Sequence, residues 1–214
     1  MTTNTFYNAN YFNYQKQIGE FGGKANLFKF EKHIASNDRV LDFGCGGGFL
    51  LKNINCKKKT GVEINKIARD FCNDVNKINC FEKIDQIEND AYDVIISNHC
   101  IEHVDSPVEI LKHLNQKLKK GGKIIIVVPN HTNKVQFKLD DVDFHFYSFS
   151  PANLGNLLVY SGFNVLSSKN LRHSWPPKYF FIEKYFKLNV FHSLSKAYSF
   201  FNNRTKQTIA VATK

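Results

Sequence analysis

The sequence lacks the cysteine patterns that mark a disulfide framework or a structural zinc site. It contains five cysteines, an odd number, and shows neither a C-x-x-C pair nor a Cys/His zinc spacing. Long apolar stretches are also absent, since the longest aliphatic run, Ile124 to Val128, is far too short to cross a bilayer. The N-terminus has no basic start followed by an apolar segment, so we expect no signal peptide. Together these absences predict a protein of a reducing compartment, the cytoplasm.

Acidic residues are scarce, and this scarcity sets the charge. The chain has 19 Asp and Glu against 29 Lys and Arg, a formal net charge of +10. That excess is compatible with nucleic acid, an anionic membrane or a phosphorylated substrate, and selects none of them. A hydrophobic content of 43% argues against disorder, and 214 residues suffice for one domain with an appendage.

Short apolar runs alternate with segments of helical periodicity along the chain. Strands are predicted at Arg39–Phe43, Lys59–Ile64, Cys80–Phe81, Tyr92–Ser97, Lys123–Val128, Phe163–Lys169 and Gln207–Thr213. Helices are predicted at Lys24–Ala35, Phe49–Ile54, Asn65–Asn76, Ser106–Lys120 and Ser150–Gly162. Strand and helix in alternation predict an α/β fold, with a parallel sheet covered by helices on both faces.

Four glycines stand within five positions in the stretch VLDFGCGGGFL, Val40 to Leu50. Glycines between a strand and a helix allow positive φ and let a ligand approach the backbone. No Lys-Ser or Lys-Thr pair follows, which excludes a P-loop, and Phe49 replaces the last glycine of a G-x-G-x-x-G fingerprint. Glu63 ends the second predicted strand, where a carboxylate can accept hydrogen bonds from both hydroxyls of a ribose. The alternative is a structural turn beside a solvated glutamate.

The stretch VLDFGCGGGFL followed by GVEI resembles motif I and the acidic end of strand two in class I S-adenosylmethionine-dependent methyltransferases. The segments YDVIISNHCIEHVDSPVEILKHLNQKLKKGGKIIIVVPN and FYSFSPANLGNLLVYSGFNV are similar to later parts of the same family, the first including its Glu-His-Val subgroup motif. The resemblance covers about Asn37 to Lys169 and a final strand. It implies a Rossmann-like, seven-stranded, mostly parallel sheet with helices on both faces and an antiparallel last strand. It also implies S-adenosylmethionine as the cofactor.

Cofactor contacts follow from this resemblance residue by residue. It places the methionine and ribose part of the cofactor against the turn after the first strand, with Asp42, Gly44, Cys45, Gly46 and Gly48. Glu63 would hold the ribose hydroxyls and Ile64 would pack on the adenine. Phe81 and Glu82 would lie at the adenine edge, while Asn98 and His99 would lie near the methionine moiety.

Methyl transfer to a hydroxyl benefits from a general base, and four side chains are candidates. His99 and His103 follow the fourth strand, and Asp143 and His145 lie in the segment DDVDFHFYSF after the fifth. Structural roles are the alternative, with His103 bracing a loop and His145 packed between its neighbours Phe144 and Phe146. A metal held by Asp140, Asp141 and Asp143 is a further alternative. We expect those acids to be solvated and predict no metal site.

Two appendages flank or interrupt the predicted core, which comprises residues 37–170 and 207–214. Residues 1–36 are predicted to form a helical lid, with Tyr11, Tyr14, Gln17 and Phe21 shielding the transfer, or else an ordinary packing helix. Residues 171–206 form an aromatic and basic helical insertion in which Phe181, Tyr185 and Leu188, then Leu194, Tyr198 and Phe201, follow helical spacing. We expect a cap packed on the domain with a basic outer face. A homodimer face, a membrane-surface helix and a nucleic-acid platform remain open.

The predicted function is a small-molecule O-methyltransferase. The Glu-His-Val segment and the N-terminal GEFGG resemble enzymes of surface-polysaccharide or natural-product pathways, which implies a hydroxyl of a sugar or related metabolite as acceptor. One alternative is an RNA or tRNA methyltransferase, but no Asn-Pro-Pro-Tyr-type motif follows the fourth strand, where the chain reads Ser97-Asn98-His99-Cys100. We therefore do not expect a nucleic-acid partner. A second alternative is a non-catalytic cofactor-binding or scaffold protein.

Overall fold

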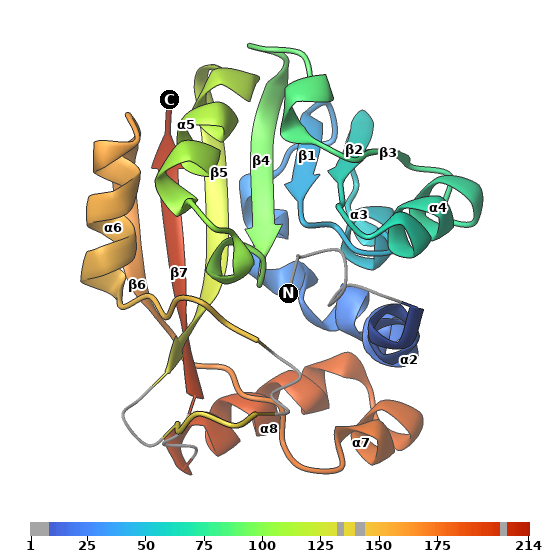
Figure 1. The fold of residues 1–214 in the computed structure, drawn as a ribbon. Coiled ribbons are helices and arrows are strands. Elements are labelled where there is room, and N and C mark those ends of the chain that lie inside the picture. Colours follow the sequence, from blue (N-terminus) through green and yellow to red (C-terminus); the bar gives the residue numbers. More distant parts are fainter. Residues whose placement is uncertain (1–8, 132–134, 140–143, 202–204) are drawn as a thin grey trace.

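The computed structural model describes residues 9–131, 135–139, 144–201 and 205–214. These described residues form a seven-stranded sheet with the order β3-β2-β1-β4-β5-β7-β6 (Figure 1). The strands are β1 (Arg39–Phe43), β2 (Lys58–Val62), β3 (Asn79–Phe81), β4 (Tyr92–Asn98), β5 (Leu118–His131), β6 (Asn164–Leu171) and β7 (Thr205–Thr213). The strands from β3 to β5 pair in parallel, and β7 is antiparallel to both β5 and β6. The predicted fold class is confirmed.

Both faces of the sheet are buried along the central strands β1, β4 and β5, which explains why these strands carry continuous apolar runs. In β5, Ile124 and Ile126 pack with α5 (Pro107–Lys117) and α6 (Pro151–Tyr160). Ile125 and Val127, on the opposite face, share a second core with residues of α3 (Phe49–Asn53) and α4 (Lys66–Asp74). The period-two alternation of side chains along a strand therefore divides the core into two halves.

The topology brings the candidate site together. The chain runs from β1 outward to β2 and β3, then returns to place β4 on the other side of β1, where Asp42 is paired with Ile96. Ligands of open α/β sheets bind in the crevice at such a reversal, outside the carboxyl ends of the strands. The glycine turn after β1 and the segment after β4 meet there, and the arrowheads of both strands point toward α2 (Figure 1).

The N-terminal helix lies earlier in the chain than predicted. Helix α2 spans Ala9–Ala25, and the predicted helix at Lys24–Ala35 is wrong, since two 3₁₀ turns, η1 (Leu27–Lys29) and η2 (Glu31–His33), occupy that segment. Glycine disfavours helices, so Gly19 and Gly23 argued against one here. Both face α3, and a Cβ at Gly19 would meet the Phe49 ring at 2.5 Å. Close packing of α2 on α3 thus outweighs the low helix propensity.

Two other element boundaries differ from the prediction for local reasons. Strand β5 continues through Pro129 to His131, although Pro129 was expected to end it. Its pairing with β4 stops at Val127, so beyond that point β5 is an edge strand on that side, where proline is tolerated. Helix α5 ends at Lys117 because Leu118 already begins β5.

The insertion between β6 and β7 contains α7 (Tyr179–Tyr185) and α8 (Leu188–Phe201). Phe191 and Tyr179 pack with Trp175 and with Phe21 of α2. The insertion therefore packs on the domain, as expected. Most members of the two predicted stripes are exposed and do not make this contact, so the outer face carries aromatic as well as basic side chains. Among the helices of the described residues, none has both the length and the apolar character required to span a membrane.

Candidate functional site

The glycine turn and Glu63 form one hydrogen-bonded unit. Gly44, Gly46 and Gly48 have φ values of 79°, 53° and 77°, a region that disfavours other residues. The N–H groups of Gly46 and Asn65 donate to the two carboxylate oxygens of Glu63, each at 2.8 Å. The carboxylate at the end of β2 is therefore fixed against the turn.

Asp42, at the end of β1, is a buried acid with 2% of its surface exposed. Burial raises the pKa of its carboxyl group well above the usual value, and the nearby charges of Cys72 and Glu63 raise it further. A carboxyl group in such a place is stabilised in its charged form by a cation. The site therefore fits a ligand that brings a positive charge to the glycine turn.

Two adjoining cavities of about 470 and 490 Å³ open at the carboxyl ends of the strands. Both are lined by Gln15 of α2 and by Gly44, His99 and His103. Together they have the size expected for small-molecule sites. Their shared wall joins the glycine turn to the segment that follows β4.

Most predicted site residues line these cavities. The first takes the residues Tyr14, Asp42, Gly44, Cys45, Gly46, Asn98, His99, His103 and His145. The second takes Gly44, Glu63, Ile64, Glu82, His99 and His103.

Four of the described candidates line neither cavity. Gly48 precedes α3, and a Cβ there would meet Cys72 Sγ at 2.6 Å, so this glycine is required for packing. Phe81 is at the sheet edge, and Phe21 packs against the insertion. Gln17 is exposed, whereas Gln15 faces the cavities. The side chain of Tyr11 lies outside the described residues, as do Asp143 and its neighbours Asp140 and Asp141.

A buried glutamate, Glu102, lies among several histidines beside the cavities. Its side chain is fully buried, and Oε1 lies 3.3 Å from His99 Nδ1 and 3.9 Å from His145 Nε2. His145 Nδ1 in turn lies 2.8 Å from His131 Nε2, and the His103 ring lies 4.8 Å from the His145 ring. Two of the predicted bases, His103 and His145, are therefore close neighbours although 42 positions separate them in the chain.

Backbone contacts hold this cluster in place. The N–H groups of Phe146 and Tyr147 donate to the backbone carbonyl of Glu102, at 3.0 and 3.2 Å, so the segment carrying His145 is tied to the turn carrying Glu102. Burial alone would raise the pKa of Glu102, but the interactions with His99 and His103 outweigh it and lower that pKa. An ionised carboxylate is thus held against imidazoles with little water. It can orient an imidazole and stabilise the imidazolium formed when that ring takes a proton.

Sequence reasoning missed several residues of the site. In the sequence, Glu102 was recognised only as part of the Glu-His-Val motif and was given no role of its own. No sequence pattern identified His131 or Trp175, which also line the first cavity. Lys29 is buried there, and its Nζ donates to Gln207 Oε1 at 2.8 Å and to Asn98 Oδ1 at 3.2 Å. Burial lowers the pKa of Lys29 to about 7, against an opposing effect of Glu102. Only the tertiary fold brings this lysine, from before β1, to the ends of β4 and β7.

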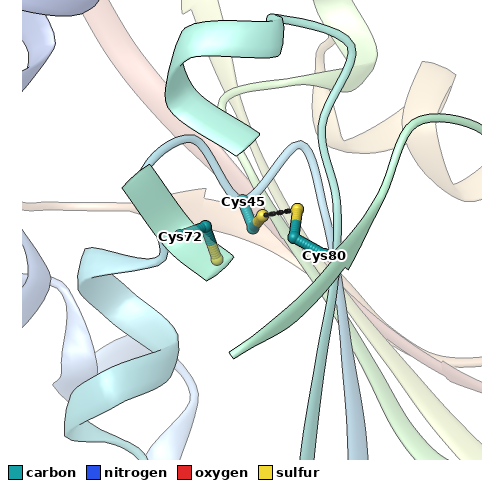
Figure 2. A group of neighbouring side chains, drawn as sticks. All are labelled: Cys45, Cys72 and Cys80. Atoms are coloured by element: carbon teal, nitrogen blue, oxygen red, sulfur yellow. Dashed lines mark hydrogen bonds between the residues drawn. The ribbon is translucent and has the colours of Figure 1, made fainter. Parts of the chain in front are cut away.

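Three thiols lie close together beside the glycine turn. Figure 2 shows Cys45 of the turn, Cys72 of α4 and Cys80 of β3 with their sulfur atoms grouped, and the Sγ atoms of Cys45 and Cys80 lie 3.3 Å apart. Ligand atoms of this trio lie within 4.8 Å of one another, as do those of Glu102, His103 and His145. Either group has donors suited to a metal, thiolate for soft ions and His/Glu for zinc-like ions. The absence of a resident metal remains a prediction.

Gly61 of β2 makes room for two of these thiols, and its replacement by alanine is expected to destabilise the protein. The added Cβ would meet Cys45 Sγ at 2.5 Å and Cys80 Sγ at 3.1 Å. Overpacking of this kind costs about 1–3 kcal/mol, so we expect a lower Tm for Gly61→Ala in a thermal melt. The matched control is Gly155→Ala in α6, where the Cβ meets Ser168 Cβ at an ordinary 3.5 Å. Equal Tm values for both variants would contradict this account.

Comparison with known proteins identifies the family. Residues 14–168 match a family model described as a methyltransferase domain. A ubiquinone biosynthesis O-methyltransferase from Nitrosococcus oceani is 30% identical over 108 residues, 45% of each chain, so the match spans about half the length of such curated relatives. The crystal structure of a SAM dependent methyltransferase from Archaeoglobus fulgidus has a TM-score of 0.66 at 21% identity, covering 95% of this chain and 99% of that one.

A second solved structure shares the fold. The phosphoethanolamine N-methyltransferase 2 of Haemonchus contortus, in complex with S-adenosyl-L-methionine, has a TM-score of 0.65 at 16% identity, covering 95% of this chain and 56% of that one. The family model spans well over half of the chain and includes the glycine turn, Glu63 and the Glu102 cluster. The chain therefore belongs to the methyltransferase-domain family, with the class I fold and S-adenosylmethionine as its cofactor.

Proposed function

We propose that the chain transfers a methyl group from S-adenosylmethionine to a hydroxyl group of a small molecule. The observation that carries the proposal is the buried Glu102 carboxylate among His99, His103 and His145, beside the cavity that the glycine turn also lines. A hydroxyl acceptor must lose a proton, and this cluster provides an imidazole with a carboxylate behind it to receive one.

The residues of the first half of the site fit the cofactor. The cofactor would supply an electrophilic methyl group on a positively charged sulfonium. Asp42 offers a buried carboxyl for positive charge, Gly44 and Gly46 leave the backbone accessible, and Glu63 presents a carboxylate for ribose hydroxyls. The protein's own task is then to orient the acceptor and exclude water, which lowers the barrier through positioning.

His145 and His103 are the proposed proton acceptors, and Glu102 is a positioning residue. Both histidines line the first cavity, whereas Glu102 is fully buried behind them. His99, with a φ of 55°, contacts both Glu102 and Gln207, which ties it into the wall of the site. The catalytic role that the sequence suggested for Asp143 remains a proposal without described geometry.

The named relatives indicate the chemical class of the acceptor. Curated relatives are named ubiquinone biosynthesis O-methyltransferases, which favours oxygen and a small molecule over RNA. The sugar acceptor expected from the sequence has no counterpart among them. An amine acceptor is the second candidate, because one structural relative is a phosphoethanolamine N-methyltransferase. An amine that reacts as the free base has less need of the histidine cluster.

A radiolabelled methyl-transfer screen tests the proposal. The purified chain is incubated with methyl-labelled S-adenosylmethionine and with phenols, nucleotide sugars, amines or RNA, and the labelled product is identified by mass spectrometry. We expect an O-methylated small molecule. Labelled amines or RNA without any O-methyl product would overturn the hydroxyl assignment, and calorimetry without cofactor binding would overturn the methyltransferase assignment itself.

A further inference from the structure

Helix α8 has two apolar faces, and only one of them is covered. Phe191 is 1% exposed and packs with Phe21 and Trp175. Val190, Leu194 and Phe201, spaced by four and seven residues, follow a neighbouring stripe of the helix, and Phe201 is 81% exposed. One side of α8 therefore belongs to the core of the insertion, whereas the adjacent side exposes apolar side chains to solvent.

Helix α7 also carries exposed apolar side chains. Tyr179 and Ile182 pack toward the core of the insertion, while Phe181 and Tyr185, on the other side of the helix, are 53% and 62% exposed with ring centroids 6.2 Å apart. We call the whole set the α7–α8 surface, whose exposed apolar members are Phe180, Phe181, Tyr185, Phe186, Leu188, Val190, Leu194, Phe200 and Phe201. So many exposed large apolar residues in one segment mark an interaction site.

Positive charge accompanies these rings. Residues 171–206 contain seven Lys and Arg and a single acid, Glu183. The exposed lysines of this segment include Lys178, Lys184, Lys187 and Lys196. Aromatic and aliphatic side chains with lysines, on helices too short to span a bilayer, are typical of helices that lie in a membrane interface.

The positive charge of this segment also distinguishes between a second copy of the chain and a lipid membrane as its binding partner. In a two-fold symmetric dimer the same patch meets itself, so the lysines of one copy would face those of the other with almost no acids to pair with them. An anionic lipid surface offers both a layer for the aromatic rings and negative charge for the lysines. We propose that the α7–α8 surface docks the protein on anionic lipid membranes.

The docking surface adjoins the site. Trp175, which lines the first cavity, has its ring 4.7 Å from the ring of Tyr179 at the start of α7. Docking would hold that wall of the cavity near the lipid, where an acceptor with an apolar tail is concentrated. This consequence for the acceptor rests on the proposed function, whereas the docking itself does not.

Vesicle sedimentation tests the docking directly. The full chain is mixed with vesicles of phosphatidylcholine alone or with phosphatidylglycerol added. We expect binding to the anionic vesicles that weakens with salt, and much weaker binding to the neutral ones. Each of Lys184→Ala and Lys187→Ala should lower the affinity roughly five-fold, the equivalent of about 1 kcal/mol per lysine near the surface. Equal binding to both vesicle types, or to neither, overturns the proposal.

A matched pair of apolar variants distinguishes specific docking from non-specific hydrophobic adsorption and from loss of folding. Phe181→Ser with Phe201→Ser should lower vesicle binding at least ten-fold. The control, Val159→Ser with Tyr160→Ser, alters exposed apolar residues of α6 that lie outside the surface, and should leave binding unchanged. Thermal melts confirm that both variants fold, and calorimetry with S-adenosylmethionine should give the same affinity in both.

The oligomeric state and the activity distinguish the remaining outcomes. Light scattering should show a monomer in both native and variant protein. A native dimer that Phe181→Ser with Phe201→Ser dissociates would instead make the surface a self-association face and overturn the proposal. Loss of vesicle binding with retained methylation of a soluble acceptor confines the defect to docking. Cofactor binding that fails in the native chain refutes the proposed function and leaves the docking result standing.

Discussion

Glu63→Ala is expected to lower the affinity for S-adenosylmethionine by about one to two orders of magnitude. The Glu63 carboxylate holds the Gly46 and Asn65 N–H groups at 2.8 Å and is also the proposed acceptor for ribose hydroxyls. Its removal leaves those polar groups without a partner, at a cost of about 1–3 kcal/mol. Calorimetric titration with S-adenosylmethionine measures the change.

The control for this variant is Glu88→Ala, which removes an exposed glutamate that pairs with Arg39 away from the cavities. We expect unchanged cofactor affinity there. Thermal melts of both variants show whether the loss of affinity arises from unfolding. Glu63→Gln keeps the shape of the side chain and one acceptor oxygen, so it should bind more tightly than Glu63→Ala. Equal affinity of native protein and Glu63→Ala would remove Glu63 from the cofactor site.

Glu102→Gln is expected to lower kcat for a hydroxyl acceptor by about 10²- to 10⁴-fold, the range that general acid–base catalysis contributes. The amide keeps the volume of the side chain but no longer stabilises an imidazolium on His103 or His145. Affinity for S-adenosylmethionine should be unchanged, because Glu102 lines neither cavity. Steady-state kinetics with the acceptor from the methyl-transfer screen, together with calorimetry, separate the two effects.

The pH profile provides a second readout for Glu102. Its interactions with histidines lower its pKa, so the carboxylate remains ionised as the pH falls through the weakly acid range. The negative charge of Glu102 is therefore present throughout that range in the native protein and absent from Glu102→Gln, so we expect the pH dependence of kcat to differ between the two proteins. Glu109→Gln alters an exposed glutamate of the second cavity and serves as the control. A profile shared by all three proteins would argue that the cluster is only structural.

Local signals in the sequence sufficed for the sheet, and they placed the glycine turn and Glu63 at the ends of the first two strands. The apolar runs, the glycines and Glu63 lie within single strand–turn–helix units, where spacing alone determines geometry. The position of α2 could not be predicted from local signals. Gly19 and Gly23 disfavour a helix by themselves, and their reason for being in one is the close approach of Phe49, which only the folded structure shows. Local propensity and tertiary packing conflict there, and packing decides.

The acceptor half depends on contacts between distant residues. His131, His145 and Glu102 become neighbours only when the segment after β5 folds back on the turn after β4. Lys29 comes to Asn98 and Gln207 from the far end of the chain. The second stripe of the insertion lies on α8 as predicted, but the first is broken, because α7 ends at Tyr185 and Leu188 begins α8. Periodicity also does not reveal which of two apolar faces is covered.

The attachment of the insertion has a consequence for the evolution of the protein. Leu171 and Gln207, which bound it, are paired neighbours in the antiparallel β6–β7 ladder. The chain therefore leaves the sheet and re-enters it at adjacent points, and any segment whose ends can meet there is compatible with the same sheet. Helices α7 and α8 can therefore change in descendants without altering the glycine turn, provided that the contacts of Phe191 and Trp175 with α2 are kept. Lineages are thus free to diversify at this junction while inheriting the cofactor chemistry intact.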